Sequence, residues 1–259
     1  MKKLLLILSF LLMLPALMLG QQDPFQVGEK AVFTIHYGLI TGGSASFELK
    51  RDTFAGKMYN HCYFKAQTTG IADAFYNIKD VYESYFDSVT LLPDYAIRNV
   101  VEGHYKRYNT NLFDRSSRKD SAIITSNLKG KHNTQKDIFD LLSMFYYFRK
   151  NWFAKDYQFK IGEVVTINTW FCDEFYPIRL IYVGMDEVKI KLGKVMCYKF
   201  NPATEVGRVF KTNEDVTVWF SADKNYLPVK MRFDIFVGAF TAELQTVEGL
   251  IQPLGIKQK

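Results

Sequence analysis

Few side chains in this 259-residue sequence stand in a pattern that supports catalysis. The sequence contains no Gly-x-Ser-x-Gly nucleophile elbow, no Walker loop, no His-Glu-x-x-His zinc motif and no Gly-x-Gly-x-x-Gly loop. The four histidines are scattered, without the spacing of metal ligands: His36, His61, His104 and His132. We therefore expect surface or strand histidines, no metal, no cofactor and a protein that is not an enzyme.

One pair of adjacent carboxylates, Asp173-Glu174, could suggest a hydrolase. A glycosidase needs two carboxylates that are brought together in space. Neighbouring residues on a strand face opposite sides of the sheet, so a turn explains this pair better than a catalytic site. A hydrolase that acts on envelope polymers is our third functional hypothesis.

The three cysteines, Cys62, Cys172 and Cys197, could form one disulfide at most. Their spacing matches no zinc site. An unpaired cysteine usually packs as a small hydrophobic residue, so we expect all three thiols to be reduced and mostly buried.

The N-terminus has the features of a signal peptide. The basic residues Lys2 and Lys3 precede an apolar run at 4–14, which is too short to span a bilayer comfortably. We predict cleavage between Gly20 and Gln21, with an uncleaved membrane anchor as the alternative. Since no later run of 18 apolar residues follows, the mature chain 21–259 should have no transmembrane segment and should be periplasmic or secreted.

The composition indicates a globular, β-rich chain. Hydrophobic residues make up 48% and aromatic residues 16%, with 22 Phe and 16 Tyr. Aromatic residues suit the half-buried surface of a sheet, and these proportions exclude a disordered chain, a collagen or a coiled coil. The net charge is +6, and its positive residues are densest between 106 and 136. We interpret that cluster as a solvated face or a contact with an anionic surface, and we expect no nucleic-acid partner.

Alternation of apolar and polar residues predicts strands with one wet face, which is typical of antiparallel sheets. Two runs are clear, one at 33–37 and one at 229–237. We predict a mainly β fold, with antiparallel curved sheets or a partly open barrel. The apolar sides of these two runs are our candidate ligand-binding residues: Phe33, Ile35, Tyr37, Met231, Phe233 and Ile235.

One segment has helical spacing instead. Apolar residues recur every three or four positions between Asp137 and Trp152, which predicts one long helix over 137–152. Thr134 would cap its start. We expect the apolar stripe of this helix to pack against a sheet.

A shift of 135 residues aligns two parts of the chain. It superposes Cys62 on Cys197, Pro93 on Pro228 and Gly103 on Gly238, and a shift of 134 superposes Gly28-Glu29 on Gly162-Glu163. We infer a single domain made of two internal repeats, about 28–113 and 162–248. The basic loop and the helix would connect them.

Several short motifs, in this order and spacing, resemble the domain of unknown function 3108 family. They are Gly28-Glu29, Tyr37-Gly38-Leu39-Ile40-Thr41-Gly42-Gly43, Asp137-Ile138, Tyr146-Tyr147-Phe148-Arg149, Trp219-Phe220-Ser221-Ala222-Asp223 and Leu227-Pro228-Val229. The resemblance spans about residues 25–248. It implies an exported protein of Gram-negative bacteria with a mostly β fold, and it supplies no activity or catalytic residue.

Two classes of function compete for such a chain. The first is a binding or carrier module in which an apolar concave sheet face holds a lipid or another amphiphile; aromatic richness and the lack of catalytic motifs favour it. The second is a structural or protein-interaction factor in envelope assembly, which would contact an envelope protein through an edge strand or the helix.

The thiol prediction can be checked by mass analysis of the unreduced, denatured protein after alkylation. Three modified thiols are expected. A single modified thiol would show that a disulfide is present.

Overall fold

A computed structural model describes residues 22–153, 157–203, 215–235 and 238–257. The predicted signal peptide, its cleavage site at Gly20 and Gln21, and Val237 lie outside the described residues. In the described part of the chain, no helix is long and apolar enough to cross a membrane.

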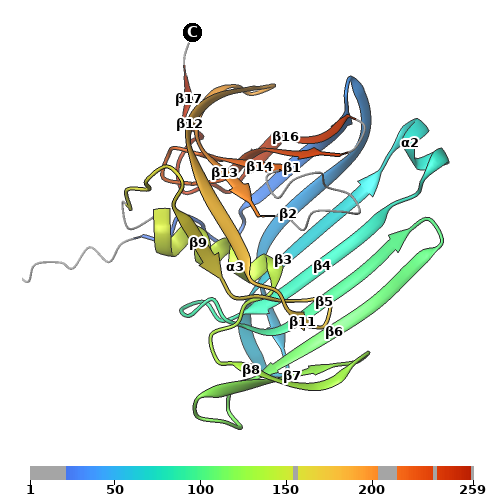
Figure 1. Cartoon of the computed structure of the whole chain (residues 1–259), viewed down its shortest axis with the longest axis vertical. Helices are drawn as coiled ribbons and strands as arrows, with labels where there is room; N and C mark the ends of the chain where they lie inside the picture. Colours follow the sequence, from blue (N-terminus) through green and yellow to red (C-terminus); the bar gives the residue numbers. More distant parts are fainter. Residues whose placement is uncertain (1–21, 154–156, 204–214, 236–237, 258–259) are drawn as a thin grey trace, which may run out of the picture.

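Fifteen strands form one antiparallel sheet, in the order β8-β7-β6-β5-β4-β3-β2-β1-β16-β15-β14-β13-β12-β9, with β17 paired to β13 (Figure 1). The strands are β1 (Lys30–Tyr37), β2 (Ile40–Phe54), β3 (Lys57–Thr68), β4 (Lys79–Phe86), β5 (Pro93–Glu102), β6 (Tyr105–Asp114), β7 (Ser121–Ser126), β8 (Gly130–Gln135), β9 (Val164–Ile167), β12 (Ile178–Ile190), β13 (Gly193–Pro202), β14 (Val216–Ser221), β15 (Pro228–Asp234), β16 (Ala239–Glu248) and β17 (Ile256–Lys257). The predicted mainly β, antiparallel fold is confirmed.

The sheet has two halves that meet where β1 pairs with β16. Each half opens with the same backbone exchange. Gly28 N and Glu29 O bond to Leu49 at 2.8 and 2.9 Å, and Gly162 N and Glu163 O bond to Tyr182 at 2.9 and 2.9 Å. The order of the strands in each half is the one that two internal repeats would produce.

The proline and glycine pairs of the proposed repeat also lie in matching elements. Pro93 is the first residue of β5, and Pro228 is the first residue of β15. Gly103 follows β5 with φ 58°, and Gly238 precedes β16 with φ 75°. These positions agree with a duplication, which stays a prediction.

The helix begins later than the sequence pattern indicates. Helix α3 spans Leu141–Phe148 and continues as a π-helical turn, η1, over Arg149–Phe153. Thr134 does not cap it, because that residue belongs to β8. Asp140 is the N-cap: its carboxylate accepts from Leu142 N and Ser143 N, while Ser143 Oγ accepts from Asp140 N. Two further elements are short, α2 (Gly70–Phe75) and the hairpin β10 (Trp170–Phe171) with β11 (Glu174–Phe175).

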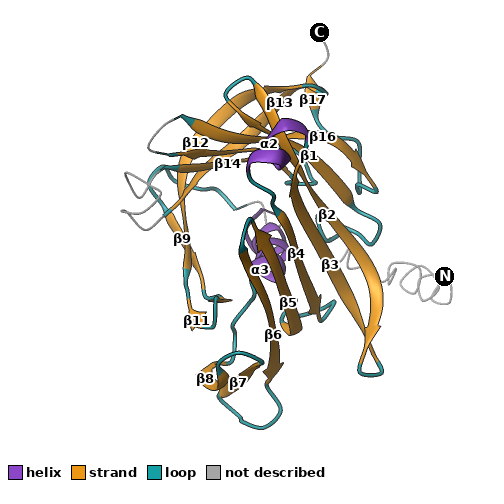
Figure 2. Ribbon diagram, turned by 90° about the vertical axis from the view of Figure 1, so that its right-hand side faces the viewer, coloured by secondary structure: helices purple, strands orange, loops and turns teal. Residues whose placement is uncertain are grey.

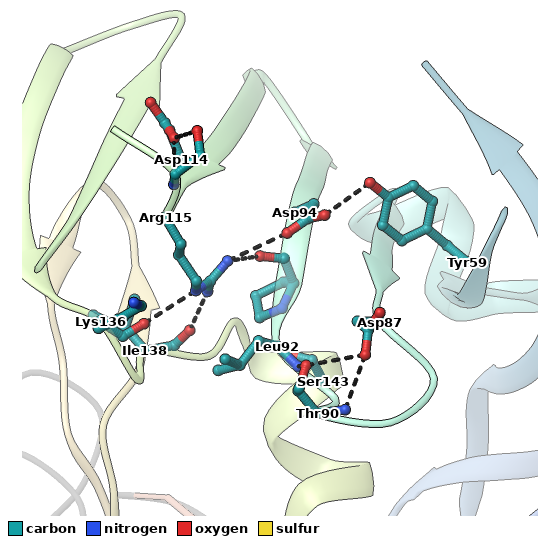
Figure 3. A network of polar contacts seen from close by, with 12 residues as sticks. Tyr59, Asp87, Thr90, Leu92, Asp94, Asp114, Arg115, Lys136, Ile138 and Ser143 are labelled. Atoms are coloured by element: carbon teal, nitrogen blue, oxygen red, sulfur yellow. Dashed lines mark hydrogen bonds and ion pairs between the residues drawn. The ribbon is translucent and has the colours of Figure 1, made fainter. Parts of the chain in front are cut away.

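An arginine clamp keeps the segment before α3 out of a helix. Arg115 donates to the carbonyls of Pro93, Lys136 and Ile138 at 2.5, 3.0 and 2.9 Å (Figure 3). The bonds to Lys136 and Ile138 satisfy carbonyl oxygens that a helix starting at Asp137 would use internally. Asp94 lies beside the clamp, where it accepts from the Tyr59 hydroxyl at 2.8 Å. These contacts with Arg115 explain why helical spacing alone places the start of the helix too early.

Helix α3 lies on the concave side of the sheet, between the β3–β5 region and β9 (Figures 1 and 2). Its aromatic side chains contact both halves. Phe145 lies 5.6 Å from Phe47, and Phe148 lies 5.4 Å from Phe200, measured between ring centroids. The stripe of the helix therefore packs against the sheet, as predicted, and it fills the interior.

A buried ion pair fixes this arrangement. Arg149 is fully buried and holds both carboxylate oxygens of Glu29, at 2.6 and 2.8 Å. The same guanidinium donates to the backbone carbonyls of Pro24 and Asn225. Phe145 lies 5.1 Å below it, within cation–π distance. One side chain thus joins the first strand, the helix and the β14–β15 turn.

Breaking this pair should be costly, because the remaining partner would be a buried charge without compensation. We expect Glu29→Gln or Arg149→Met to lower the free energy of unfolding by about 3–5 kcal/mol. Urea denaturation followed by circular dichroism measures this change.

The neighbouring pair Lys150–Asp23, at 3.0 Å and partly exposed, supplies the control. Lys150→Met should cost about 0–1 kcal/mol. Similar losses for Lys150→Met and Arg149→Met would contradict the role assigned to Arg149.

Candidate ligand-binding site

The register of β15, β16 and β1 brings the predicted ligand-binding residues together. Ile35 lies opposite Ala242, and Ala242 lies opposite Met231. Tyr37, Phe240 and Phe233 form the next row in the same way. Opposite residues in an antiparallel pair point to the same side of the sheet. The residues share one side, which we call the apolar face: Phe33, Ile35, Tyr37, Met231, Phe233, Phe240, Ala242 and Leu244.

Ile235 is the exception among the six predicted residues. It lies beyond the end of β15, where its backbone N–H bonds Gly238 O at 3.2 Å in the turn to β16. The alternating sequence pattern continues past the end of β15, so it assigns a side of the sheet to Ile235 although this residue lies outside the strand. Ile235 is half-buried in that turn.

Exposure increases along the apolar face from one end to the other. Phe33 is 0% exposed and belongs to the core, Ile35 is half-buried, and Tyr37 is 37% exposed. On β16, Leu244 is buried while Phe240 is 42% exposed and lies 5.1 Å from the Tyr37 ring. The core is therefore continuous with apolar surface at the end of the sheet that carries the β1–β2 turn.

Further exposed apolar side chains extend this surface, and we call them the apolar rim. They come from the β1–β2 turn and from α2 with the residue after it: Leu39, Ile40, Ile71, Phe75 and Tyr76. The two segments adjoin, because Thr69 N bonds Gly42 O at 3.0 Å. Large contiguous apolar patches on a protein surface often mark contact with a partner or a membrane.

Sequence reasoning missed the rim for two reasons. The alternating run ends before Leu39 and Ile40, and α2 is too short to show helical periodicity. One signal is available: Leu39 and Ile40 are bulky apolar residues between Gly38 and Gly42, where a turn would usually carry polar residues.

The polar residues beside the apolar face point away from it, as expected. Thr34 lies opposite Glu243, which in turn lies opposite Lys230 and binds its Nζ at 2.7 Å. Arg232 forms an ion pair with Asp234. Both signs of charge occur near the rim: Lys79 and Lys106 are exposed on β4 and β6, and Asp73 lies within α2.

The remaining candidates for chemistry have structural roles. Within the described ranges, no group of three His, Cys, Asp or Glu could hold a metal ion. His61 packs flat on Tyr85 at 4.1 Å and contacts Glu83. Asp173 lies in the tight turn between β10 and β11, where it accepts from Arg107 and Asn109. The turn explanation of Asp173-Glu174 therefore fits the structure.

All three cysteines are free. Cys62 and Cys197 are buried, and burial raises the pKa of both thiols, that of Cys197 to about 12. Cys172 is partly exposed at the β10–β11 turn. The expectation of reduced, mostly buried thiols agrees with this arrangement.

The interior offers little room beside α3. The cavity that β4–β6, the start of α3 and the β10–β11 hairpin enclose measures about 30 Å³. Ligand pockets for molecules of drug size measure about 300–1,000 Å³. An acyl chain does not fit into this cavity, and the exposed end of the apolar face is the better candidate site.

This architecture defines a class of barrel-like, antiparallel β proteins. The family model "Protein of unknown function (DUF3108)" matches residues 32–245, and the chain belongs to this family. The family resemblance inferred from the short motifs is thereby confirmed.

A solved structure has a similar fold. It is the crystal structure of a beta-barrel-like protein of domain of unknown function DUF1849 from Brucella abortus. The TM-score is 0.56 at 8% sequence identity, over 86% of this chain and 98% of the other. No curated protein matches the chain significantly.

Because exposure increases along the apolar face, replacing its aromatic residues by alanine should cost less stability toward the exposed end. Phe33→Ala should lower the free energy of unfolding by about 3–5 kcal/mol, because it leaves a cavity in the core. Phe233→Ala and Tyr37→Ala should each cost less, since their side chains are already partly in water. Chemical denaturation of the three variants provides the test, and equal losses at all three positions would contradict the gradient.

Proposed function

We propose that this protein is a non-enzymatic binding module that holds a lipid or another amphiphile at the apolar rim. It would act in the periplasm or outside the cell, after removal of residues 1–20. The observation that carries the proposal is the continuity between the buried part of the apolar face and the exposed side chains of the rim. A monomeric soluble chain rarely leaves such a surface without a partner.

The position of α3 supports binding at the rim over binding inside the sheet. Helix side chains occupy the concave side, where Phe145 and Phe148 contact rings from both halves. A bound acyl chain would therefore lie against Tyr37, Phe240 and the rim. This changes the carrier hypothesis, because the ligand is held at an open end and not enclosed.

Two exposed lysines near the rim favour an anionic head group, while the Asp73 carboxylate in α2 already accepts from Thr68 and Asn77. Lys79 and Lys106 are exposed at the same end of the sheet, in the first residues of β4 and β6. A lipid phosphate or carboxylate could contact them while its chain covers the rim. Anionic phospholipid is therefore the probe that we expect to bind best.

The test is co-sedimentation of the mature protein with phosphatidylglycerol vesicles and, in parallel, with phosphatidylcholine vesicles. The double variant Leu39→Glu/Ile71→Glu should weaken binding to phosphatidylglycerol by about tenfold or more, because each Leu or Ile contributes about 1.5–3 kcal/mol when fully buried. Native mass spectrometry after gentle purification should show bound lipid on the wild type.

A matched control lies at the other end of the sheet. Val89, in the turn after β4, is 75% exposed, which equals the exposure of Ile71. Ile161, just before β9, is exposed as well. Val89→Glu/Ile161→Glu adds the same negative charge and should leave binding unchanged. Equal weakening by both double variants would contradict the rim as the site. A co-purifying protein without lipid would favour the interaction hypothesis instead.

A further inference from the structure

A small cavity lies on the concave side of the first half, away from the apolar rim. It is bounded by the inner wall of β4, β5 and β6, by the first residues of α3 and by the β10–β11 hairpin. Its lining includes Tyr82, Arg98, Asn109, Asn111, Trp170 and Cys172, and also the acidic residues Glu83 and Asp140. The cavity is partly open to solvent, so a small solute could enter.

Arg98 is the dominant charge at this cavity. Its Nε donates to the Tyr82 hydroxyl at 3.2 Å, and its guanidinium carbon lies 5.4 Å from the Phe171 ring centroid. Among the described residues, Arg98 takes part in no ion pair, and its one hydrogen bond runs from Nε to the Tyr82 hydroxyl. A guanidinium on a cavity wall without an anionic partner is an anion-binding group.

Two other lining residues carry polar atoms that lack a hydrogen-bond partner. They are Asn111 Oδ1 and Trp170 Nε1, on side chains of residues that are only 8% and 6% exposed. Buried polar atoms are nearly always paired in folded proteins, so such exceptions call for an explanation. Both residues line the same small cavity, which suggests that a polar ligand belongs there.

The wall is held in place without a ligand. Asn109 donates to Ser126 Oγ and to Asp173 Oδ1, both at 3.1 Å, and Asp173 also binds Arg107 at 3.2 Å. These bonds fasten the β10–β11 hairpin to β6. A fixed wall lowers the ordering cost of binding, since little must be rearranged.

The two carboxylates at the cavity have other partners, and Glu83 contacts His61 Nε2 at 2.9 Å. Asp140 accepts from Ser84 Oγ, Leu142 N and Ser143 N, at 2.5, 2.7 and 3.0 Å. Its oxygens are therefore occupied by the cap of α3 and by β4. Arg98 remains available for an external anion.

We propose that this cavity binds the carboxylate group of a small carboxylic acid. The volume of about 30 Å³ has room for two or three water-sized groups, because one water needs about 10–15 Å³ on the same measure. The carboxylate oxygens accept from Arg98 and from Trp170 Nε1, and a water that enters with the ligand donates to Asn111 Oδ1. This site is independent of the lipid contact at the rim.

The indole N–H resonances of the three tryptophans provide a direct test by ¹H–¹⁵N NMR. Titration with sodium acetate should shift the Trp170 signal in a saturable way. Trp219 serves as an internal control, because its Nε1 already donates to Asp186 at 3.0 Å. Sodium chloride at equal ionic strength should shift neither signal.

Substitutions then connect the shift to Arg98. Arg98→Gln should weaken acetate binding at least tenfold. Arg98→Lys should retain part of the affinity, because an ammonium group keeps the positive charge but lacks the two parallel donors of a guanidinium. Arg51→Gln, on an exposed arginine of β2, should have no effect. The fold of each variant is checked by the rest of its amide spectrum.

A second titration with decanoate distinguishes the source of the carboxylate. If acetate suffices, the ligand is a small free acid; if only decanoate binds, the proposal of a small acid is overturned. The proposal is overturned if neither acid shifts the Trp170 signal, or if Arg98→Gln binds as tightly as the wild type.

Discussion

The ion pair between Arg149 and Glu29 is the interaction on which the arrangement of the molecule depends. A buried guanidinium is tolerated only where hydrogen bonds replace its hydration. Glu29 supplies two acceptors, and the backbone carbonyls of Pro24 and Asn225 supply the others. These partners come from the segment before β1, from the start of the first half and from a turn of the second half. Because the bonds form together only in one geometry, they specify how the helix and the two halves meet.

The interior and the surface of the protein follow from that geometry. With Arg149 anchored, the aromatic side chains of α3 and η1 fill the concave side, where Phe153 stacks on Tyr226 at 4.7 Å. The apolar face can then be exposed only toward the end that carries Tyr37 and Phe240. A barrel-like fold is shared with proteins of very different sequence, so the function must be argued from such sites and not from the architecture.

Much of this fold could be predicted from local patterns, and the remainder depends on contacts between distant segments. Alternation identified β1 and most of β15 and showed which of their residues share a side. It could not show that β16 lies between them, because periodicity does not identify a strand's neighbour. An arginine after the last apolar turn of a helix usually faces water, so nothing local indicated that Arg149 is buried. Likewise, no local signal opposes a helix from Asp137, because the residue that keeps this segment out of a helix, Arg115, lies in another loop.

The central claim is that the helix-filled interior excludes an acyl chain and that the rim accepts it. Methyl NMR with a spin-labelled fatty acid tests this most directly, because the label broadens only nearby signals. The methyl signals of Ile35, Ile40 and Ile71 should broaden, while those of Leu142 and Ile167 in the core should remain sharp. Broadening of the core methyl signals with an unaffected rim would contradict the account.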